Sequence, residues 1–333
     1  MMSALEAGGP QVGPVDEAVT ATAAAFRDLV TAGWSVPLPG AGATLARWRA
    51  LAAVGEQDLA LARLVEGHAD AVAVLAELDG PPVAAGQRLG VWAAEPPGGE
   101  VTAVRTARGW RLSGRKQWCS GARALTAALV TATADDGRRL FLVDLAHPGV
   151  RVDPGAWVGA GMAGSDTADV LLVDVPARPV GGPRAYLDRP GFWHGGIGVA
   201  AVWVGGARGV AATLTDVAVQ RGADPLRDAA LGAADLALAG VEAALQVAAA
   251  EVDADPRDDA GDAQLRAHRV RGLAARAGEE VLGVVGRALG AGPLAHDAGH
   301  ATRVADLTVY LRQHHGSRDD AALGALLRQR APR

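Results

Sequence analysis

Trp118 and Ser120 stand two residues apart in a segment whose pattern predicts a strand. Residues i and i+2 of a strand share a face, so an indole and a hydroxyl would point to the same side. A flat apolar wall with a hydroxyl beside it suits a planar ring that carries a hydrogen-bonding nitrogen. Far along the chain, Gly290–Ala291–Gly292 would let the backbone approach a phosphate closely. Taken alone, Trp118 fits a core aromatic equally well, and the glycine turn fits a helix C-cap.

Three histidines are candidates for moving a proton, namely His194, His314 and His315. An imidazole titrates near pH ~6.5, so it can serve as a general base at neutral pH. Histidines are also common at helix ends and on surfaces, which is the alternative for each of the three. No metal site is expected, because the acidic run after Asp253 is typical of a solvated loop and the chain has one cysteine, Cys119.

The composition excludes several classes of protein. Half of the residues are hydrophobic, so a sizeable core can form, and the 37 acidic side chains outnumber the 32 basic ones, which argues against a nucleic-acid binder. The longest uninterrupted apolar run, Ile197 to Gly206, is about half of the ~18 residues that a membrane span needs. No signal peptide is evident, and we expect a cytoplasmic protein without a membrane span.

The hydrophobic period changes twice along the chain, which predicts an α+β fold with segregated layers. Residues 1–14 are expected to form a disordered lead, and residues 15–82 a short N-terminal helical lobe, with Thr44 as the N-cap of one helix. Residues 83–182 are expected to form a small β-barrel or sandwich, in which 101–105 and 109–113 make a hairpin. Residues 183–333 are expected to form a C-terminal four-helix bundle. Its predicted helices are 198–220, 229–252, 263–289 and 301–311.

Six short motifs in order resemble the acyl-CoA dehydrogenase family over about residues 45–325. They are Glu95–Pro96, the segment 114–122 with Trp118 and Ser120, 141–150, Gly164–Ser165–Asp166–Thr167 leading into 170–176, 289–292, and the late helix 303–306 followed by Gly316–Ser317. The resemblance implies the fold of that family and an FAD-dependent oxidoreductase that acts on an acyl thioester or a related carbonyl compound.

The resemblance also implies roles for single residues. The aromatic residue of the motif covers the flavin and the hydroxyl contacts its N5, which assigns Trp118 and Ser120 to FAD. Further cofactor contacts would come from Ala94, Arg221, Arg287, Gly290, Ala291 and Ser317. Gly99 and Glu100 would lie on the substrate side. Family members pair through their bundle helices, so a homodimer or homotetramer is expected, together with an electron-transfer or reductase partner.

Several positions depart from the family pattern. His315 stands where the family has its catalytic glutamate, and His194 lies near the alternative position of that base, again without a carboxylate. Ala94 replaces a threonine that contacts the flavin. The Gly-Ser-Asp motif is replaced by 98–100, and the Arg-x-x-Phe-Gly motif that reaches a neighbouring subunit is reduced to Arg221–Gly222–Ala223, without phenylalanine. We therefore expect a divergent member that lacks the usual base, with His315 as the candidate in its place.

Three functions remain open at this level. The chain could be an acyl-CoA dehydrogenase-type enzyme that oxidises CH–CH bonds, as the ordered motifs imply. It could instead be a flavin-dependent monooxygenase of the same fold, which takes reduced flavin from a partner reductase and needs no glutamate. The degraded motifs also fit a non-catalytic subunit of a hetero-oligomer.

Overall fold

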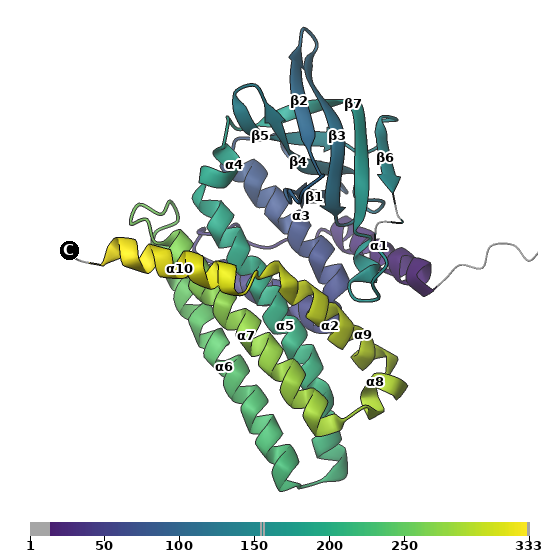
Figure 1. Ribbon diagram of the computed structural model, residues 1–333, viewed down its shortest axis with the longest axis vertical. Helices are drawn as coiled ribbons and strands as arrows, with labels where there is room; N and C mark the ends of the chain where they lie inside the picture. Colours follow the sequence, from purple (N-terminus) through teal and green to yellow (C-terminus); the bar gives the residue numbers. More distant parts are fainter. Residues whose placement is uncertain (1–13, 154, 156, 332–333) are drawn as a thin grey trace, which may run out of the picture.

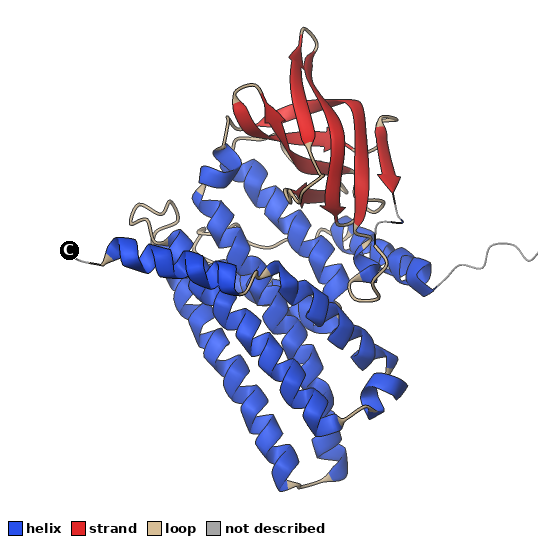
Figure 2. Cartoon of the chain, viewed as in Figure 1, coloured by secondary structure: helices blue, strands red, loops and turns tan. Residues whose placement is uncertain are grey.

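A helical lobe opens the chain and is followed by a β-barrel and a helical bundle (Figure 1, Figure 2). The computed structural model describes residues 14–153, 155 and 157–331. The helices of the lobe are α1 (Pro14–Thr31), α2 (Thr44–Gln57) and α3 (Leu59–Glu77). The predicted disordered lead lies outside the described residues except for Pro14, which begins α1.

The strands of the central region close into a small barrel. They are β1 (Leu89–Trp92), β2 (Val101–Thr106), β3 (Gly109–Cys119), β4 (Ala127–Ala134), β5 (Gly137–Asp144), β6 (Val150–Asp153) and β7 (Ala168–Val180). Going round the ring, β4 is followed by β2, β3, β7 and β5, and β5 pairs with β4 again. β1 lies beside β4, and β6 lies beside β7. The predicted hairpin is confirmed, since β2 and β3 pair antiparallel from Val101 with Gly114 to Thr106 with Gly109.

Helices make up the rest of the described chain. They are α4 (Ala185–Asp188), α5 (Pro190–Arg221), α6 (Pro225–Ala254), α7 (Ala263–Leu289), α8 (Gly292–His296), α9 (Ala298–Tyr310) and α10 (Ser317–Arg330), with short 3-10 turns η2 (Ala163–Ser165) and η3 (Leu311–Gln313). The long helices α5, α6 and α7 pack together, and α9 packs against α5. The sequence analysis did not assign α4, α8 or α10. Figure 1 shows α10 running across the upper part of α7, which it contacts.

The helix α3 joins the barrel to the bundle. Towards the barrel, Val74 and Leu75 pack with Leu89 and Leu129 in one apolar cluster. Towards the bundle, the side chain of Leu59 lies against the backbone of Gly206 in α5. Because α3 contacts both parts, it fixes the side of the barrel that faces the helices.

The helix α2 crosses α5 closely, and its start is held by a distant residue. A Cβ atom on Gly205 of α5 would lie 2.0 Å from the carbonyl oxygen of Ala52, so only glycine permits this approach. The prediction that Thr44 is an N-cap is wrong: the N-cap is Ala43, without a side-chain cap bond. The Asp253 carboxylate at the end of α6 instead accepts from the Thr44 backbone amide at 3.0 Å and from its hydroxyl at 2.6 Å.

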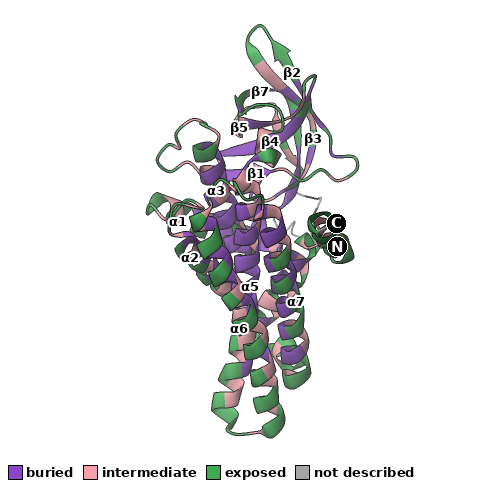
Figure 3. Ribbon diagram, turned by 90° about the vertical axis from the view of Figure 1, so that its left-hand side faces the viewer, coloured by how far each residue is buried: buried purple, intermediate pink, exposed green. Residues whose placement is uncertain are grey.

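Two helices are long and apolar enough to span a membrane by length and hydropathy alone, α5 and α6. The sequence analysis considered uninterrupted apolar runs, whereas this criterion averages hydropathy over a window that can include glycines and a few charges. In α5 the most apolar window is 72% buried inside the protein, whereas in α6 it is 28% buried. Figure 3 shows the difference, with α5 largely buried and the lower part of α6 largely exposed.

Candidate functional site

The C-terminal end of β3 presents Trp118 outside the barrel. The pairing of β3 with β7 shifts register between Lys116 and Cys119, which marks a bulge. At the bulge Trp118 has φ +62°, a left-handed conformation that is unusual for an aromatic residue. Its side chain is 54% exposed and meets Trp157 edge to face, with ring centroids 5.7 Å apart. The bulge thus supplies a flat aromatic wall with one open side, which excludes the core-aromatic alternative.

Cys119, the next residue, points the other way. Its thiol is buried, and it donates a hydrogen bond to the carbonyl oxygen of Lys116 at 3.3 Å. Burial raises the pKa of the Cys119 thiol well above its usual range. It therefore does not take part in the chemistry of the exposed face.

The loop from 93 to 100 runs beside this wall. A Cβ atom on Gly99 would lie 3.0 Å from the side-chain oxygen of Gln117, so the backbone of the loop lies against the residue that precedes Trp118. Ala94 and Glu100 are exposed on the same loop. The structure therefore places Gly99 against Gln117, the residue before Trp118, with Glu100 next to Gly99 in the chain.

Glu95 ties that loop to the barrel. Its carboxylate accepts a hydrogen bond from the Thr131 hydroxyl at 2.9 Å, forms an ion pair with Arg138, and lies 3.9 Å from the amine of Lys116. Lys116, the one lysine of the chain, is fully buried and donates to Thr131. Burial lowers the pKa of Lys116 to about 8, against the opposing effect of Glu95.

Three hydroxyl groups form a chain that begins at Ser120. The Ser120 and Thr167 hydroxyl oxygens are 2.9 Å apart, and Thr167 and Ser165 are again 2.9 Å apart. Ser165 then donates to the carbonyl oxygen of Met162 at 2.7 Å. The backbone carbonyl of Ser120 in turn accepts from the indole N–H of Trp92 at 3.1 Å.

The loop that carries Ser165 and Thr167 is held against α9. Asp306 accepts a hydrogen bond from the Met162 amide at 2.5 Å, and a Cβ atom on Gly161 would lie 2.4 Å from the carbonyl oxygen of Ala305. Burial raises the pKa of Asp306 to about 6, against the lowering effect of the Met162 amide. The late helix therefore fixes the position of the hydroxyl chain.

A buried charged group that sequence reasoning missed lies beneath Ser120. Arg63 and Glu66 of α3 form an ion pair of 2.7 Å, and the Tyr310 hydroxyl lies 3.5 Å from the same oxygen of Glu66. Burial raises the pKa of Glu66, against the lowering effect of Arg63. A space of about 10 Å³, the size of one water, is lined by Arg63 and Ser120 among others. The signal in the sequence was a pair of charges at i and i+3 in an otherwise apolar helix.

The junction between η3 and α10 carries the other candidates. The side chain of His314 is 8% exposed and that of His315 is 64% exposed. Both imidazoles lie near Asp319, at 3.7 Å and 3.5 Å, and the Asp319 carboxylate also accepts from the His315 amide at 3.1 Å. Burial lowers the pKa of His314, against the raising effect of Asp319. Ser317 begins α10 and is exposed.

His194 lies apart from these groups. It is buried in α5, and its Nε2 atom is 3.3 Å from the carbonyl oxygen of Pro256 in the loop between α6 and α7. Its Nδ1 atom has no hydrogen-bond partner within the described chain. Burial lowers the pKa of His194. Its hydrogen-bond contact joins it to the bundle and not to the Trp118 wall.

Four predicted cofactor contacts lie at the opposite end of the bundle. Arg221 ends α5, Arg287 stands in the last turn of α7, and Gly290 and Ala291 follow it; all four are exposed. α5 starts ten residues after the barrel and has 32 residues, about 48 Å at ~1.5 Å per residue. One chain therefore does not bring these residues to the Trp118 wall.

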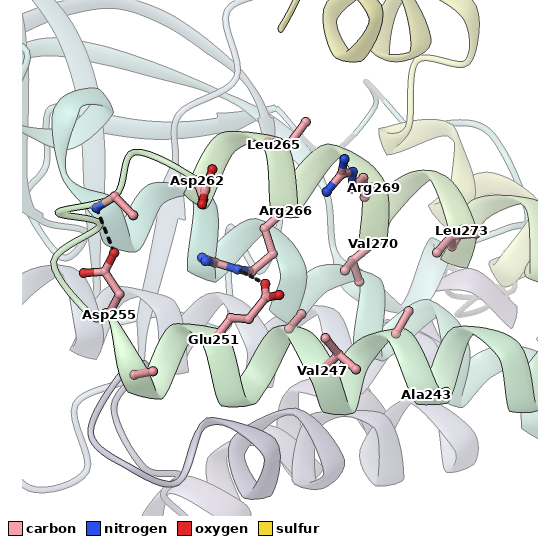
Figure 4. Close-up of a pocket in the computed structure, with 14 residues that line it drawn as sticks. Ala243, Val247, Glu251, Asp255, Asp262, Leu265, Arg266, Arg269, Val270 and Leu273 are labelled. Atoms are coloured by element: carbon pink, nitrogen blue, oxygen red, sulfur yellow. Dashed lines mark hydrogen bonds and ion pairs between the residues drawn. The ribbon is translucent and has the colours of Figure 1, made fainter. Parts of the chain in front are cut away.

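A groove of about 650 Å³ lies between α6 and α7 (Figure 4). Its walls include Val247 of α6 and Val270 of α7, and an ion pair of 2.7 Å joins Glu251 to Arg266 across it. None of the predicted site residues lines it. Among the described residues, no group of three or more His, Cys, Asp or Glu side chains could hold a metal ion, and the groove carries none.

Part of the chain matches a known family model. Residues 92–175 match the model described as acyl-CoA dehydrogenase, middle domain. This segment holds Trp118, Ser120 and the loop with Ser165 and Thr167. No curated protein gives a significant sequence match to the chain.

Solved structures of low sequence identity share the whole architecture. TdsC of Paenibacillus sp. A11-2, a dibenzothiophene monooxygenase solved with FMN and indole, is 18% identical with a TM-score of 0.75, over 96% of this chain and 98% of that one. KijD3, solved with FMN and a dTDP-amino-keto sugar, is 20% identical with a TM-score of 0.72, over 97% and 96%. Glutaryl-CoA dehydrogenase from Mycobacterium smegmatis is 17% identical with a TM-score of 0.70, over 89% and 84%.

Proposed function

We propose that this chain, which has the acyl-CoA dehydrogenase-like fold and the middle domain of that family, is a flavin-dependent monooxygenase. The observation that carries the proposal is the junction before α10. It offers His314 and His315 where a thioester dehydrogenase needs a carboxylate base, and the nearby Asp319 is occupied by the His315 amide and both imidazoles. The FMN bound in the structures of TdsC and KijD3 supports the same direction.

The residues at the end of β3 fit a flavin. Trp118 would cover one face of the ring, since its indole is exposed and held by a strained backbone. Ser120 would lie at the ring edge, and the backbone of the 93–100 loop would flank it. When bound, a reduced flavin would supply the two electrons with which O₂ is split, so that one oxygen atom enters the substrate and the other leaves as water.

His314 would hold a proton at this site. Its side chain is almost fully buried and burial lowers its pKa, so the imidazole is neutral at pH 7 and can donate a hydrogen bond through one nitrogen. His314 Nδ1 accepts from the Gly316 amide at 3.2 Å, which leaves Nε2 as the nitrogen that carries the hydrogen, near Asp319. The neighbouring His315 is open to solvent in a single chain.

The positions of the predicted cofactor contacts bear on the form of the flavin. FMN lacks the adenylate half of FAD, and the structures of TdsC and KijD3 contain FMN. FAD, which the family resemblance implied, has an adenylate half that would need Arg221, Arg287, Gly290 and Ala291. Those residues lie at the other end of the bundle, so FAD would require a second copy of the chain. We propose FMN as the cofactor of one chain.

We also propose that the chain forms a homo-oligomer through α6. Leu226, Leu236 and Val247 are exposed on a helix that is apolar enough to be buried. The groove between α6 and α7 is continuous with this surface, since Val247 belongs to both. A second copy of the chain, docked on this surface, would also bring the exposed bundle end of one chain to the other chain.

Binding and turnover test the proposal. The purified protein should bind FMN, and Trp118→Ala should weaken that binding, whereas Trp34→Ala, a distant half-buried tryptophan in the lobe, should not. With a flavin reductase, NADH and O₂, an oxygenated product is expected from a heteroaromatic or amine substrate. Anaerobic reduction of the bound flavin by an acyl thioester would instead establish the dehydrogenase. A protein that binds neither FMN nor FAD would be the non-catalytic subunit.

The histidines are distinguished by replacement. His314→Ala should lower the rate of the chemical step by about tenfold, because a positioned hydrogen-bond donor is lost. His315→Ala should have less effect, unless a second copy covers it. His315→Glu restores the carboxylate of the dehydrogenase pattern and should add no thioester oxidation. The rate constant of oxygen transfer in single turnovers measures the two alanine variants, and anaerobic reduction of the bound flavin by an acyl thioester measures His315→Glu.

A further inference from the structure

We infer that the hydroxyl chain from Ser120 through Thr167 to Ser165 presents Ser120 to the flavin as a hydrogen-bond acceptor, so that the site selects reduced over oxidised flavin. The inference rests on the proposed function, because it needs the flavin ring to lie beside Trp118 and Ser120. It assigns roles to Ser165 and Thr167, which would act on the cofactor through Ser120 as positioning residues.

The far end of the chain of hydroxyls fixes its direction. Ser165 lies 2.7 Å from the carbonyl oxygen of Met162. A carbonyl can only accept, and a serine hydroxyl has one hydrogen, so the hydrogen of Ser165 points to Met162. Ser165 is buried, so no solvent competes for that hydrogen. The Ser165 oxygen is left with lone pairs alone.

Each following bond is then determined. Thr167, at 2.9 Å, must donate to Ser165, because Ser165 has no hydrogen to give. Thr167 has thereby used its own hydrogen, so Ser120, also at 2.9 Å, must donate to Thr167. The hydrogen of Ser120 points into the protein, and toward its other neighbours Ser120 offers only lone pairs.

The loop geometry keeps this order in place. Met162 and Asp166 both have left-handed backbone conformations, with φ +60° and +47°, on either side of Ser165. Asp166 is clamped by Arg123, at 2.9 Å from the guanidinium Nε atom and 2.6 Å from Nη2. The Gly121 amide donates to the carbonyl oxygen of Ser165 at 2.8 Å. The three hydroxyls are therefore held between fixed backbone segments.

The two redox forms of flavin differ at N5, the ring atom that the family resemblance would place beside Ser120. N5 of oxidised flavin has a lone pair and no hydrogen, whereas N5 of reduced flavin carries a hydrogen. An acceptor beside it forms a hydrogen bond with the reduced form and faces a second lone pair in the oxidised form. For one hydrogen bond made by one redox form only, we expect about a tenfold preference for the reduced form. A protein that takes reduced flavin from a reductase needs this selectivity.

The experiment compares the dissociation constants of reduced and oxidised FMN, measured anaerobically on the same preparation. The ratio of the dissociation constant of oxidised FMN to that of reduced FMN should be about tenfold higher in wild type than in Thr167→Val. In the variant Ser120 regains a free hydrogen. For a two-electron couple, tenfold is about 30 mV in the midpoint potential of the bound flavin. Ser165→Ala should have the same effect, since Thr167 can then donate to Ser120 and turn the Ser120 hydrogen outward.

Ser165→Ala is the sharper variant, because Ser165 does not contact Ser120 and acts two hydrogen bonds away. The matched control is Thr102→Val, which deletes an exposed hydroxyl bonded to the Ser113 carbonyl on the β2–β3 hairpin and should leave the ratio unchanged. A purely structural role of Thr167 or Ser165 would weaken both redox forms equally. Thermal melting shows whether each variant is folded.

The outcomes separate the inference from the proposed function. A reduced-to-oxidised ratio that falls about tenfold in both Thr167→Val and Ser165→Ala supports the inference. Binding of both forms with a ratio that the two variants leave unchanged overturns the inference and leaves the flavin site standing. If wild type binds neither form, the proposed function fails and the inference fails with it.

Discussion

The barrel side of the site and the outer face of α6 are built in opposite ways. At the barrel, the polar groups around Ser120 find their partners within one chain, as the three hydroxyls do. On α6, apolar side chains have no cover, and Leu226 is 83% exposed in a helix of high hydropathy. Monomeric proteins rarely expose an apolar face of this kind, so we expect another molecule to bury it.

The difference separates two kinds of property. What happens at Trp118 and Ser120 depends on contacts within one chain, so it should not vary with protein concentration. What happens at α6, and at the distant Arg221 and Gly290, depends on a second copy and should vary with concentration. Substitutions in each region test whether these properties depend on one chain or on a second copy, and the largest effect is expected beside the barrel.

The buried pair beneath Ser120 should give the largest loss of stability. Arg63→Met leaves the Glu66 carboxylate buried without its ion-pair partner, which should lower the free energy of unfolding by about 3–5 kcal/mol. Urea denaturation at two protein concentrations measures the loss, which should be the same at both.

Two further variants serve as comparisons for Arg63→Met. Arg63→Met/Glu66→Leu should be more stable than Arg63→Met alone, because no unpaired charge then remains. Arg27→Met breaks an exposed ion pair with Asp28 and should cost at most about 0.5 kcal/mol. A loss at Arg63 as small as at Arg27 would mean that water reaches Glu66.

The α6 face should give the next largest effect. Leu236→Arg/Val247→Arg places two charges on the proposed interface and should raise the dissociation constant of the oligomer about 100-fold or more. Burying one leucine or valine contributes roughly 1.5–3 kcal/mol, and 1.4 kcal/mol is about tenfold. Sedimentation velocity across a concentration series measures it.

Val104→Arg is the matched control, since Val104 is also exposed and apolar but lies on the β2–β3 hairpin of the barrel. It should leave the oligomeric state unchanged. If Val104→Arg dissociates the oligomer and the α6 variant does not, the interface lies on the barrel and the comparison above is reversed.

Lys116 should give the smallest effect, and one that depends on pH. In the folded chain its amine loses its proton near pH 8, whereas in the unfolded chain it does so near pH 10.5. Between these values the unfolded chain binds more protons, so stability rises with pH. Relative to Lys116→Met, wild type should gain roughly 1–2 kcal/mol between pH 7 and 9.5. A stability difference that is independent of pH would contradict the burial of a charged amine. Chemical denaturation across that range measures it.

Much of the fold follows from local patterns in the chain. The β2–β3 hairpin was predictable because alternation and a turn lie within thirteen residues, 101–113. The start of α2 was not, because the group that caps it, Asp253, is 209 residues from Thr44. α10 was missed because its charged first turn and its small residues give a weak apolar stripe, and none of its residues is buried in a single chain.

The candidate site divides in the same way. Trp118 and Ser120 were predicted from i, i+2 spacing on one strand, but β3 ends at Cys119 and is bulged at Trp118, so that spacing does not by itself put both side chains on one face. The hydroxyl chain was not predictable. Thr167 lies next to Ser120 because its loop turns at two residues in left-handed conformations, and the sequence does not reveal those conformations. Arg63 and Glu66 were missed because a charge pair on a helix ordinarily faces solvent, and only the packing of α3 between barrel and bundle buries it.

The buried thiol of Cys119 can report local opening of the barrel. As the one cysteine, buried and flanked by Trp118 and Ser120, it reacts with an alkylating reagent only when β3 separates locally from its neighbours. The labelling rate therefore measures the opening of β3, the strand that carries Trp118, without any engineered probe. Slower labelling on addition of a ligand would locate that ligand on this strand, and the ratio of rates would give the free energy by which it holds the strand closed.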